Sequence, residues 1–252
     1  MRLTLLERPT TVTSRSFKVK LEAYLAELKG DLSANVMLEG FSQTGWSQIE
    51  ILGEDAEIVT HIISNKLGVA RTRLDQIEAP QVCDGQIIGL HARGLKFDVG
   101  LDSQSVIPII PTEHLQAQLA DGKALPLSQL VECYCLYAGE QISARITKKT
   151  NNAIEGWLSD QQVDALSHRI TSGLDRIETF DCFKEEAESA VNRAHLSRDV
   201  IAVERETLTL QSIVCKLGTD AVGLIPKLGR ALKKQELHIF LPNRIVKRCR
   251  PW

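Results

Sequence analysis

The chain has 252 residues, of which 43 % are hydrophobic and 25 % charged, the composition of a well-cored soluble protein with one to three domains. Its formal net charge of −2 excludes a globally basic nucleic-acid coat protein but leaves room for local basic patches. No apolar stretch approaches the roughly 18 residues of a membrane span, which excludes an integral membrane helix.

The start of the chain, MRLTLLERPTTV, turns polar within a few residues and resembles no secretory signal. Six cysteines are scattered along the sequence, and only Cys133 and Cys135 lie close together. Their segment looks helical, which would place the two thiols on opposite faces, whereas structural zinc sites need two close pairs. We therefore expect a cytoplasmic protein with reduced, mostly buried thiols, no metal site and no cofactor.

Residues 1–79 predict an N-terminal α/β domain. Helices are expected over 17–29 and 54–67, where apolar residues recur at helical spacing and Gly30 and Gly68 follow as stop signals. Strands are expected over 2–7, 34–38 and 46–52. The resulting order is βαββα.

Residues 80–159 predict a five-stranded OB-type barrel. The opening VCDGQIIGLHARGLKFDVGL alternates apolar and polar residues around a turn at 92–94, and residues 106–110 make a third strand. Short helices over 112–120 and 127–137 precede a hairpin of strands over 141–147 and 153–158. Three strands, a helical insertion and two strands is the element order of an OB barrel.

Residues 160–252 predict a C-terminal α/β domain with a basic tail. A linking helix over 160–170 leads to strands over 174–180, 199–204, 207–216 and 237–241, with helices over 183–195 and 219–234. The βαββα order of the first segment recurs here, so an internal duplication is a hypothesis. The expected fold class is α+β, with two small βαββα segments flanking a central five-stranded barrel that has a helical insertion.

The run RDVIAVERETLTLQSIVCKLGTDAVGLIPKLGRAL, Arg198–Leu232, resembles an archaeal family known as domain of unknown function 2110. The signature is its core VCKLGTDAVGLIPKLGR, and the barrel segment looks like the middle of the same family. The resemblance implies an archaeal, cytoplasmic origin and a three-part architecture of α/β units and an OB barrel, but no activity. Separately, the Gly-rich opening and DVGL strand of the barrel are similar to RNA-binding barrels of ribosomal and cold-shock proteins.

The barrel loops carry the first candidate site. OB barrels bind ligands on strands two and three and between the first–second and fourth–fifth strand loops. Here the first of these loops carries Arg93 with Lys96 just beyond, and the other carries Lys148, Lys149 and Asn151. Neither loop contains Asp or Glu, so we expect salt-dependent contacts to RNA phosphates. The alternative interpretation is that these are ordinary solvated loop residues.

Aromatic residues decide between single-stranded and folded RNA. Single-strand binders stack bases on exposed aromatic rings. Phe97 falls on the apolar strand face, Tyr134 and Tyr137 lie in the inserted helix, and Trp157 alternates with apolar residues. Since no outward aromatic is identified, we expect recognition of structured RNA by backbone and shape.

The C-terminal segment carries the strongest local charge. From Lys227 to Arg250 there are eight cations and one acid, a local charge of +7. Lys227, Arg230 and Lys234 are expected on one helix face, and the rest in a tail, NRIVKRCRPW, with little core-forming potential. The predicted nucleic-acid-binding residues here are Lys227, Arg230, Lys233, Lys234, Arg244, Lys247, Arg248 and Arg250. A helix end favoured by its dipole and a disordered tail are the alternatives, and the absence of an apolar face favours RNA over membrane.

No enzyme motif assembles in the sequence. The six histidines form no HxxxH or HxH pair, no GxSxG occurs, and the carboxylates mostly lie on polar helix faces. The segment CKLGTDAVGLIPKLG is a candidate anion site at a helix N-terminus, although Asp220 fits equally as a helix cap.

The leading hypothesis is a non-catalytic RNA-binding accessory factor that contacts structured RNA of the ribosome, ribosomal RNA or transfer RNA. The alternative is a protein-interaction module that docks to ribosomal, translation or transcription proteins through its basic tail. Binding that survives nuclease treatment would favour the second.

Overall fold

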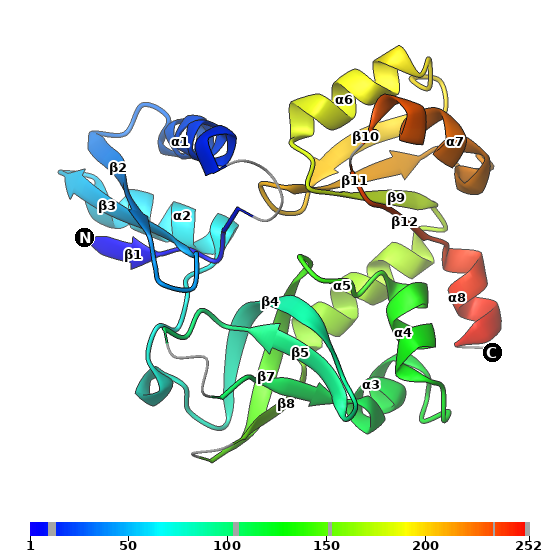
Figure 1. The fold of residues 1–252 in the computed structure, drawn as a ribbon, viewed down its shortest axis with the longest axis horizontal. Coiled ribbons are helices and arrows are strands. Elements are labelled where there is room, and N and C mark those ends of the chain that lie inside the picture. Colours follow the sequence, from blue (N-terminus) through cyan, green and yellow to red (C-terminus); the bar gives the residue numbers. More distant parts are fainter. Residues whose placement is uncertain (10–13, 103–105, 151–152, 234, 250–252) are drawn as a thin grey trace.

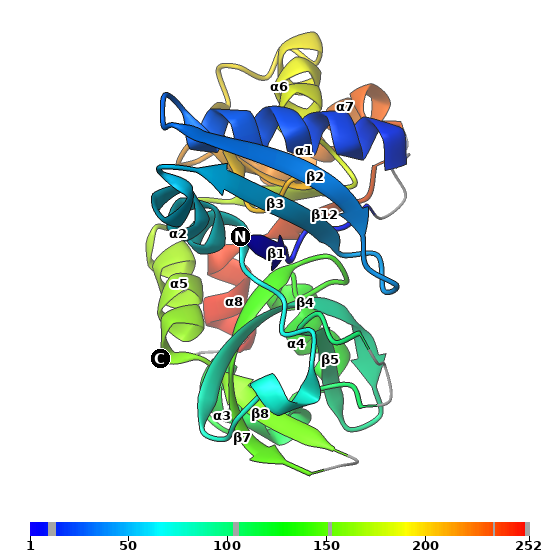
Figure 2. The ribbon, with the colours of Figure 1, turned by 90° about the vertical axis from the view of Figure 1, so that its left-hand side faces the viewer.

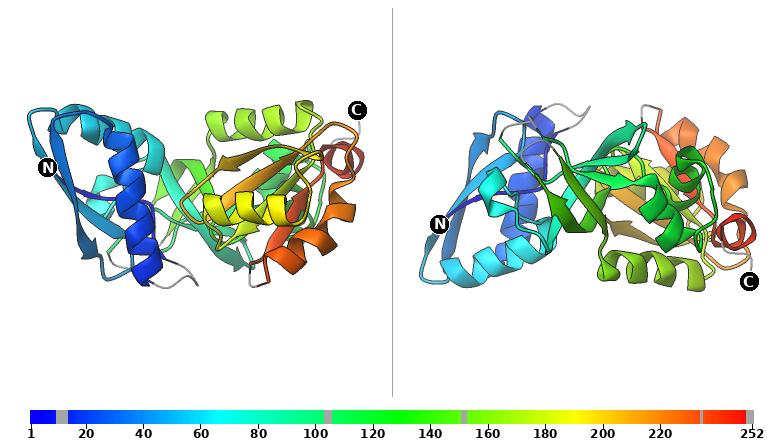
Figure 3. Two further views of the ribbon diagram at one scale, coloured as in Figure 1. Left: turned by 90° about the horizontal axis from the view of Figure 1, so that it is seen from above. Right: turned by 90° about the horizontal axis from the view of Figure 1, so that it is seen from below.

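The computed structural model describes residues 1–9, 14–102, 106–150, 153–233 and 235–249. Two α/β units lie next to each other along the long axis of the molecule, and a β-barrel lies below them (Figures 1 and 3). The closed five-stranded barrel and the flanking small sheets confirm the predicted α+β class.

The N-terminal unit is a three-stranded antiparallel sheet with two helices on one face. Its strand order is β1-β3-β2. Apolar side chains from β3 and both helices, among them Phe17, Ile49 and Ile63, form its core. The elements are β1 (Arg2–Thr4), α1 (Ser14–Lys29), β2 (Ala34–Phe41), β3 (Ser47–Gly53) and α2 (Ala56–Leu67), and a short helix, η1 (Leu74–Gln76), leads to the barrel.

The central unit is a closed barrel with the strand order β4-β5-β6-β8-β7. Its elements are β4 (Gln81–His91), β5 (Gly94–Asp98), β6 (Ile109–Pro111), α3 (Thr112–Leu119), α4 (Leu127–Tyr134), β7 (Gln141–Lys149) and β8 (Ile154–Leu158). The parallel pairing of β6 with β8, at Ile109 and Glu155, closes the sheet. This strand order, with the helices between the third and fourth strands, is that of an OB barrel and confirms the prediction.

The C-terminal unit is a four-stranded antiparallel sheet with the order β10-β11-β9-β12. Its elements are α5 (Asp160–Thr171), β9 (Arg176–Phe180), α6 (Lys184–Arg193), β10 (Val200–Arg205), β11 (Leu210–Cys215), α7 (Ala221–Ala231), β12 (Leu237–Phe240) and α8 (Pro242–Arg248). The part from β9 to β12 is a split βαβ motif. Its β9-β11-β10 order matches β1-β3-β2 of the N-terminal unit, which keeps the duplication a viable hypothesis.

The two sheets differ in what covers them. Helices α6 and α7 cover one face of the C-terminal sheet, and α5 with the barrel covers the other (Figure 1). On that second face Arg176, Glu178 and Ser212 are all buried. Arg2, Met37 and Leu52 of the N-terminal sheet, in contrast, are exposed on the face that α1 and α2 leave open.

Residues 242–248 form a helix, so the expected tail without core-forming potential is wrong for this stretch. Pro242 begins α8 at a position where its missing N–H costs nothing. Ile245 and Cys249 then enter the core of the barrel together with Phe240 from β12. Helix α8 has only about two turns, which is too short for its apolar residues to repeat often enough to indicate a helix in the sequence.

None of the helices in the described ranges is both long and apolar enough to cross a bilayer.

Candidate nucleic-acid interface

The β4–β5 turn and the end of β7 each bring a cation to the same carboxylate. Arg93 Nη2 pairs with Oε1 of Glu155 on β8, and Lys148 Nζ lies 3.8 Å from Oε2 of the same side chain. Gly94 permits this turn, because a Cβ there would lie 2.0 Å from the carbonyl oxygen of Ile110. Lys148 and Lys149, expected in the loop between the last two strands, lie instead at the end of β7, where Lys148 is the cross-strand partner of Glu155. Arg93 and Lys148 thus meet at an acid that lies outside both predicted loops.

One cross-strand row continues the surface around the barrel. Lys96 pairs with Ile109, Ile109 with Glu155, and Glu155 with Lys148. The strand neighbours of Lys96, Ile109 and Glu155 are buried, so these three side chains lie on the outside, and Lys148 is itself exposed beside them. Three of the predicted residues, Arg93, Lys96 and Lys148, thus share one outer face.

The side chain of Trp157 lies on the outer face of the barrel, although the sequence analysis identified no outward-facing aromatic residue. Ile154 and Leu158 are buried, so Glu155 and Trp157 alternate onto the outer face of β8, where Trp157 is half-buried. The ring of His114 from α3 stacks on Trp157, with centroids 3.9 Å apart and planes 15° from parallel. The alternation in the sequence IEGWL contained this signal.

Lys149 does not belong to the exposed cationic set. Its Nζ donates hydrogen bonds to the carbonyl oxygens of Leu74, at 2.8 Å, and Ile77, at 2.6 Å. The bulge between Ile146 and Lys148 turns it toward η1, so that two adjacent lysines point in different directions. Asn151 lies outside the described residues.

A second cationic surface lies between the end of α6 and α7. Arg193, Lys227, Arg230 and Lys233 line a groove of about 810 Å³, and no acid is among the described residues of its lining. Helix α7 ends at Ala231, so the expectation of three cations on one helix face over 219–234 is wrong beyond Arg230. Lys234 lies outside the described residues, and Arg193 was not predicted.

The cations of α8 divide into one that is paired and two that are exposed. Arg244 forms an ion pair with Glu132 of α4, which helps to fix α8 against the barrel. Lys247 and Arg248 are exposed in its last turn. Arg250 lies outside the described residues.

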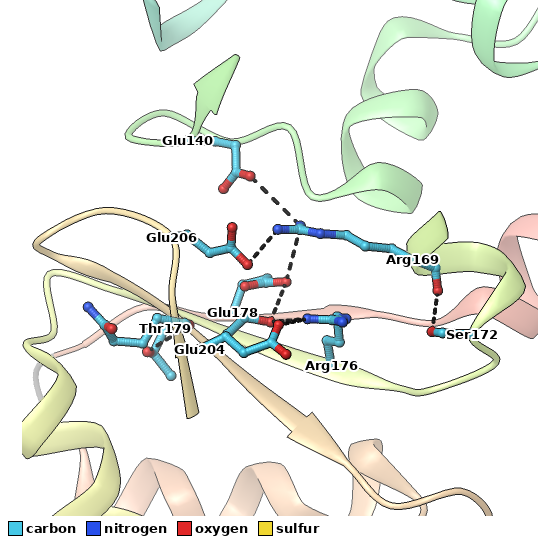
Figure 4. A network of polar contacts seen from close by, with 10 residues as sticks. Glu140, Arg169, Ser172, Arg176, Glu178, Thr179, Glu204 and Glu206 are labelled. Carbon is cyan, nitrogen blue, oxygen red and sulfur yellow. Dashed lines mark hydrogen bonds and ion pairs between the residues drawn. The ribbon is translucent and has the colours of Figure 1, made fainter. Parts of the chain in front are cut away.

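A buried ionic cluster joins the barrel to the C-terminal unit (Figure 4). Arg169 of α5 pairs with Glu206 at 2.6 Å and lies 3.7 Å from Glu178 and 3.9 Å from Glu140. Burial raises the pKa of Glu178 to about 7 and that of Glu140 well above its ordinary value, although Arg169 opposes both shifts. Both Oε2 atoms are buried without a hydrogen-bond partner among the described groups, which suits a protonated carboxyl better than a carboxylate. The cluster is a largely buried junction between the barrel and the C-terminal unit.

The segment ahead of α1 joins all three units. Glu7 Oε1 accepts a hydrogen bond from Leu208 N–H at 3.1 Å, and Arg8 donates to Gln86 Oε1 at 2.8 Å and Asp98 Oδ2 at 3.2 Å. Burial raises the pKa of Glu7 to about 8, against the lowering effects of the Leu208 N–H and of Arg205.

The described residues hold no group of three metal-ligating side chains. All six cysteines are free and buried, as expected. Asp220 caps α7, since its Oδ1 accepts from Val222 N–H at 3.1 Å. The candidate anion site there is therefore occupied by the chain's own cap.

The fold and these surfaces define an OB-barrel protein with two flanking α/β units. Within it, residues 174–240 match the family model described as DUF2110 C-terminal domain, which confirms the resemblance read from Val214–Arg230. The match spans β9 to β12. A comparison with curated proteins found no match.

Two solved structures are among those similar to the chain. The solution structure of GSP13 from Bacillus subtilis has 14 % identity and a TM-score of 0.25, over 34 % of this chain and 58 % of that one. A chain of the a/eIF2alpha-aDim2p-rRNA complex from Pyrococcus horikoshii OT3 has 13 % identity and a TM-score of 0.26, over 48 % of this chain and 60 % of that one. Similarities at this level carry no functional argument.

Proposed function

We propose that this chain is a non-catalytic, cytoplasmic RNA-binding factor that contacts the phosphates of structured RNA. The observation that carries the proposal is the convergence of Arg93 and Lys148 on the two oxygens of Glu155. Arg93 lies in the β4–β5 turn and Lys148 near the end of β7, next to the two loops that frame the ligand face of an OB barrel. A carboxylate already lies between them, and a phosphodiester likewise offers one negative charge shared by two acceptor oxygens.

The groove on the C-terminal unit supports the same proposal independently. Arg193, Lys227, Arg230 and Lys233 approach one another there, and the described part of the lining contains no compensating acid. Uncompensated positive charge in a concave surface attracts polyanions and raises their association rate. We therefore assign RNA contact to two surfaces, the barrel face and this groove.

The experiment is a binding titration of the full chain with a structured RNA across a range of salt concentrations. The double variant Arg93→Glu/Lys148→Glu should weaken binding at least tenfold at low salt. Its slope of log affinity against log salt should be shallower by about 1.4 to 1.8, because two phosphate contacts are lost.

A matched control is Arg15→Glu/Lys66→Glu, which makes the same charge change at exposed positions of the N-terminal unit. If both double variants lose affinity equally, only net charge matters and the barrel is not the interface. If the unaltered chain shows no salt-dependent binding, the proposed RNA-binding function is wrong. Association with ribosomes or transfer RNA belongs to the same proposal, and nuclease-sensitive co-sedimentation would test it.

A further inference from the structure

We infer that the outer face of β8 binds one unpaired nucleotide of the RNA. Its phosphate takes the place of the Glu155 carboxylate, and its base lies against the Trp157–His114 stack. This inference rests on the proposed function and specifies which part of a structured RNA the barrel holds: a loop, bulge or end.

The phosphate half of the site is formed by two cations that are reachable from solvent. The side chains of Arg93 and Lys148 are 60 % and 61 % exposed, whereas that of Glu155 is 17 % exposed. Because both cations are largely solvated, their attraction to Glu155 is screened by water, and an incoming anion can compete with the carboxylate for them. Glu155 thus stands in for phosphate while the site is empty and competes with it when RNA arrives.

The base half of the site lies on the same strand face. Trp157 follows Glu155 by two residues, about 7 Å along β8, a separation on the scale of phosphate to base within one nucleotide. The imidazole of His114 is fixed, because its Nδ1–H donates to the carbonyl oxygen of Gly156 at 2.9 Å. A ring held in this way loses little conformational freedom when a base binds.

Neighbouring side chains extend the site on both sides. Arg145 lies opposite Trp157 on β7 and is held by Asp160, with Nη2 and Oδ2 2.6 Å apart. On the other side, Ile109 and Lys96 continue the outer row with an apolar surface and then a cation. Stacking surface and charge alternate across the barrel, as in grooves that hold a single strand.

The arrangement selects unpaired nucleotides. Bases inside a helix are stacked and paired, so they reach an aromatic ring only after flipping, whereas loop bases are free to turn outward. The barrel, for which the sequence predicts recognition of RNA backbone and shape, therefore also has a site for one base on the outer face of β8.

The test compares two RNAs on the full-length chain: a hairpin with an eight-uridine loop, and a blunt duplex of the same stem. Trp157→Leu should weaken hairpin binding roughly ten- to a hundredfold, the range for one stacked base, and leave duplex binding unchanged. Trp157→Phe should retain most of the affinity. Glu155→Gln should tighten hairpin binding several-fold, because the competing carboxylate is gone.

Tryptophan fluorescence supplies a second measurement should a variant fold poorly. The hairpin should quench the emission of the unaltered chain, and Trp157→Phe should abolish that quenching. Equal losses for both RNAs in Trp157→Leu, or weaker binding by Glu155→Gln, would overturn the inference. If the unaltered chain binds both RNAs alike and Trp157→Leu changes nothing, only the inference fails; if it binds neither RNA, the proposed function fails as well.

Discussion

At the scale of single residues, two adjacent lysines have different roles. Lys148 is 61 % exposed and meets Glu155 on the outer face, while Lys149 donates to two main-chain carbonyls around η1. A buried carbonyl that loses its donor pays the desolvation cost of an unmade hydrogen bond, about 1–3 kcal/mol. The sequence analysis assigns both lysines to the same nucleic-acid-binding loop, because nothing in the sequence distinguishes their environments.

We expect Lys149→Met to lower the free energy of unfolding by about 1–3 kcal/mol, since it removes the Lys149 donor from the Ile77 carbonyl and leaves the Leu74 carbonyl with only the N–H of Ile77. Lys148→Met should change stability by no more than about 0.5 kcal/mol, as is usual for surface positions, and should weaken RNA binding instead. Urea unfolding and RNA titration of both variants separate the two effects. The opposite pattern would assign Lys149 to the interface.

The burial of Glu7 makes the stability of the folded chain depend on pH. Burial raises its pKa from 4.5 to about 8, so the folded chain keeps a proton there that the unfolded chain releases. Because the folded state binds more protons between these two values, stability must fall as pH rises through this window. The greatest slope from one such group is about 1.4 kcal/mol per pH unit.

We expect Glu7→Gln to flatten this dependence. An amide oxygen can still accept from Leu208 N–H, and it has no charge to bury. The variant should match the unaltered chain near pH 5 and exceed it in stability at pH 8. Chemical unfolding at intervals between the two pH values measures this, and parallel curves for both proteins would show that Glu7 is not the titrating group.

At the scale of elements, α8 joins residues 242–248 to the core of the barrel. Ile245 is 1 % exposed and lies in the core with Phe240, and Arg244 is paired to Glu132 of α4. The basic residues of this helix are consequently displayed on a fixed element, with Lys247 and Arg248 exposed.

Ile245→Ala should lower the free energy of unfolding by about 2–5 kcal/mol, because it leaves a cavity in the barrel core. Lys247→Ala, on the exposed side of the same helix, should alter it by no more than about 0.5 kcal/mol. Denaturant unfolding followed by circular dichroism checks both. Equal stability of the two variants would mean that α8 does not contribute to the core.

The sequence predicted most elements because their apolar periodicities are strong, as in α1 and β5. It missed α8, since two turns with a single buried face give too short a pattern. It also missed the role of Glu155, because the parallel pairing of β6 with β8 joins residues 46 positions apart (109 and 155). Trp157 was predictable, as its strand alternates buried and outward positions.

At the scale of the whole molecule, the two cationic surfaces lie far apart. Helices α6 and α7, which form the groove, lie at the opposite end from the β7–β8 hairpin in two perpendicular views (Figures 1 and 2). A short RNA cannot reach both surfaces, so each should bind its own copy. A long RNA that reaches both gains affinity through the high effective concentration of the second contact.

We therefore expect a stoichiometry of two for a short hairpin and of one, with tighter binding, for an RNA long enough to span the molecule. Lys227→Glu/Arg230→Glu should reduce the short-RNA stoichiometry to one and remove the advantage of the long RNA. Isothermal titration calorimetry measures both quantities. A stoichiometry of one for the short hairpin in the unaltered chain would restrict binding to a single surface.

The contact between Glu7 and Leu208 bears on how the chain is made. The two residues are 201 positions apart, and Phe183 and Leu208 complete the core of the N-terminal unit. Synthesis proceeds from the N-terminus, so this unit emerges first yet lacks part of its core until most of the chain has been translated. Its final packing is therefore a late, long-range step, and during translation the nascent chain exposes an apolar surface for which folding factors and premature association would compete.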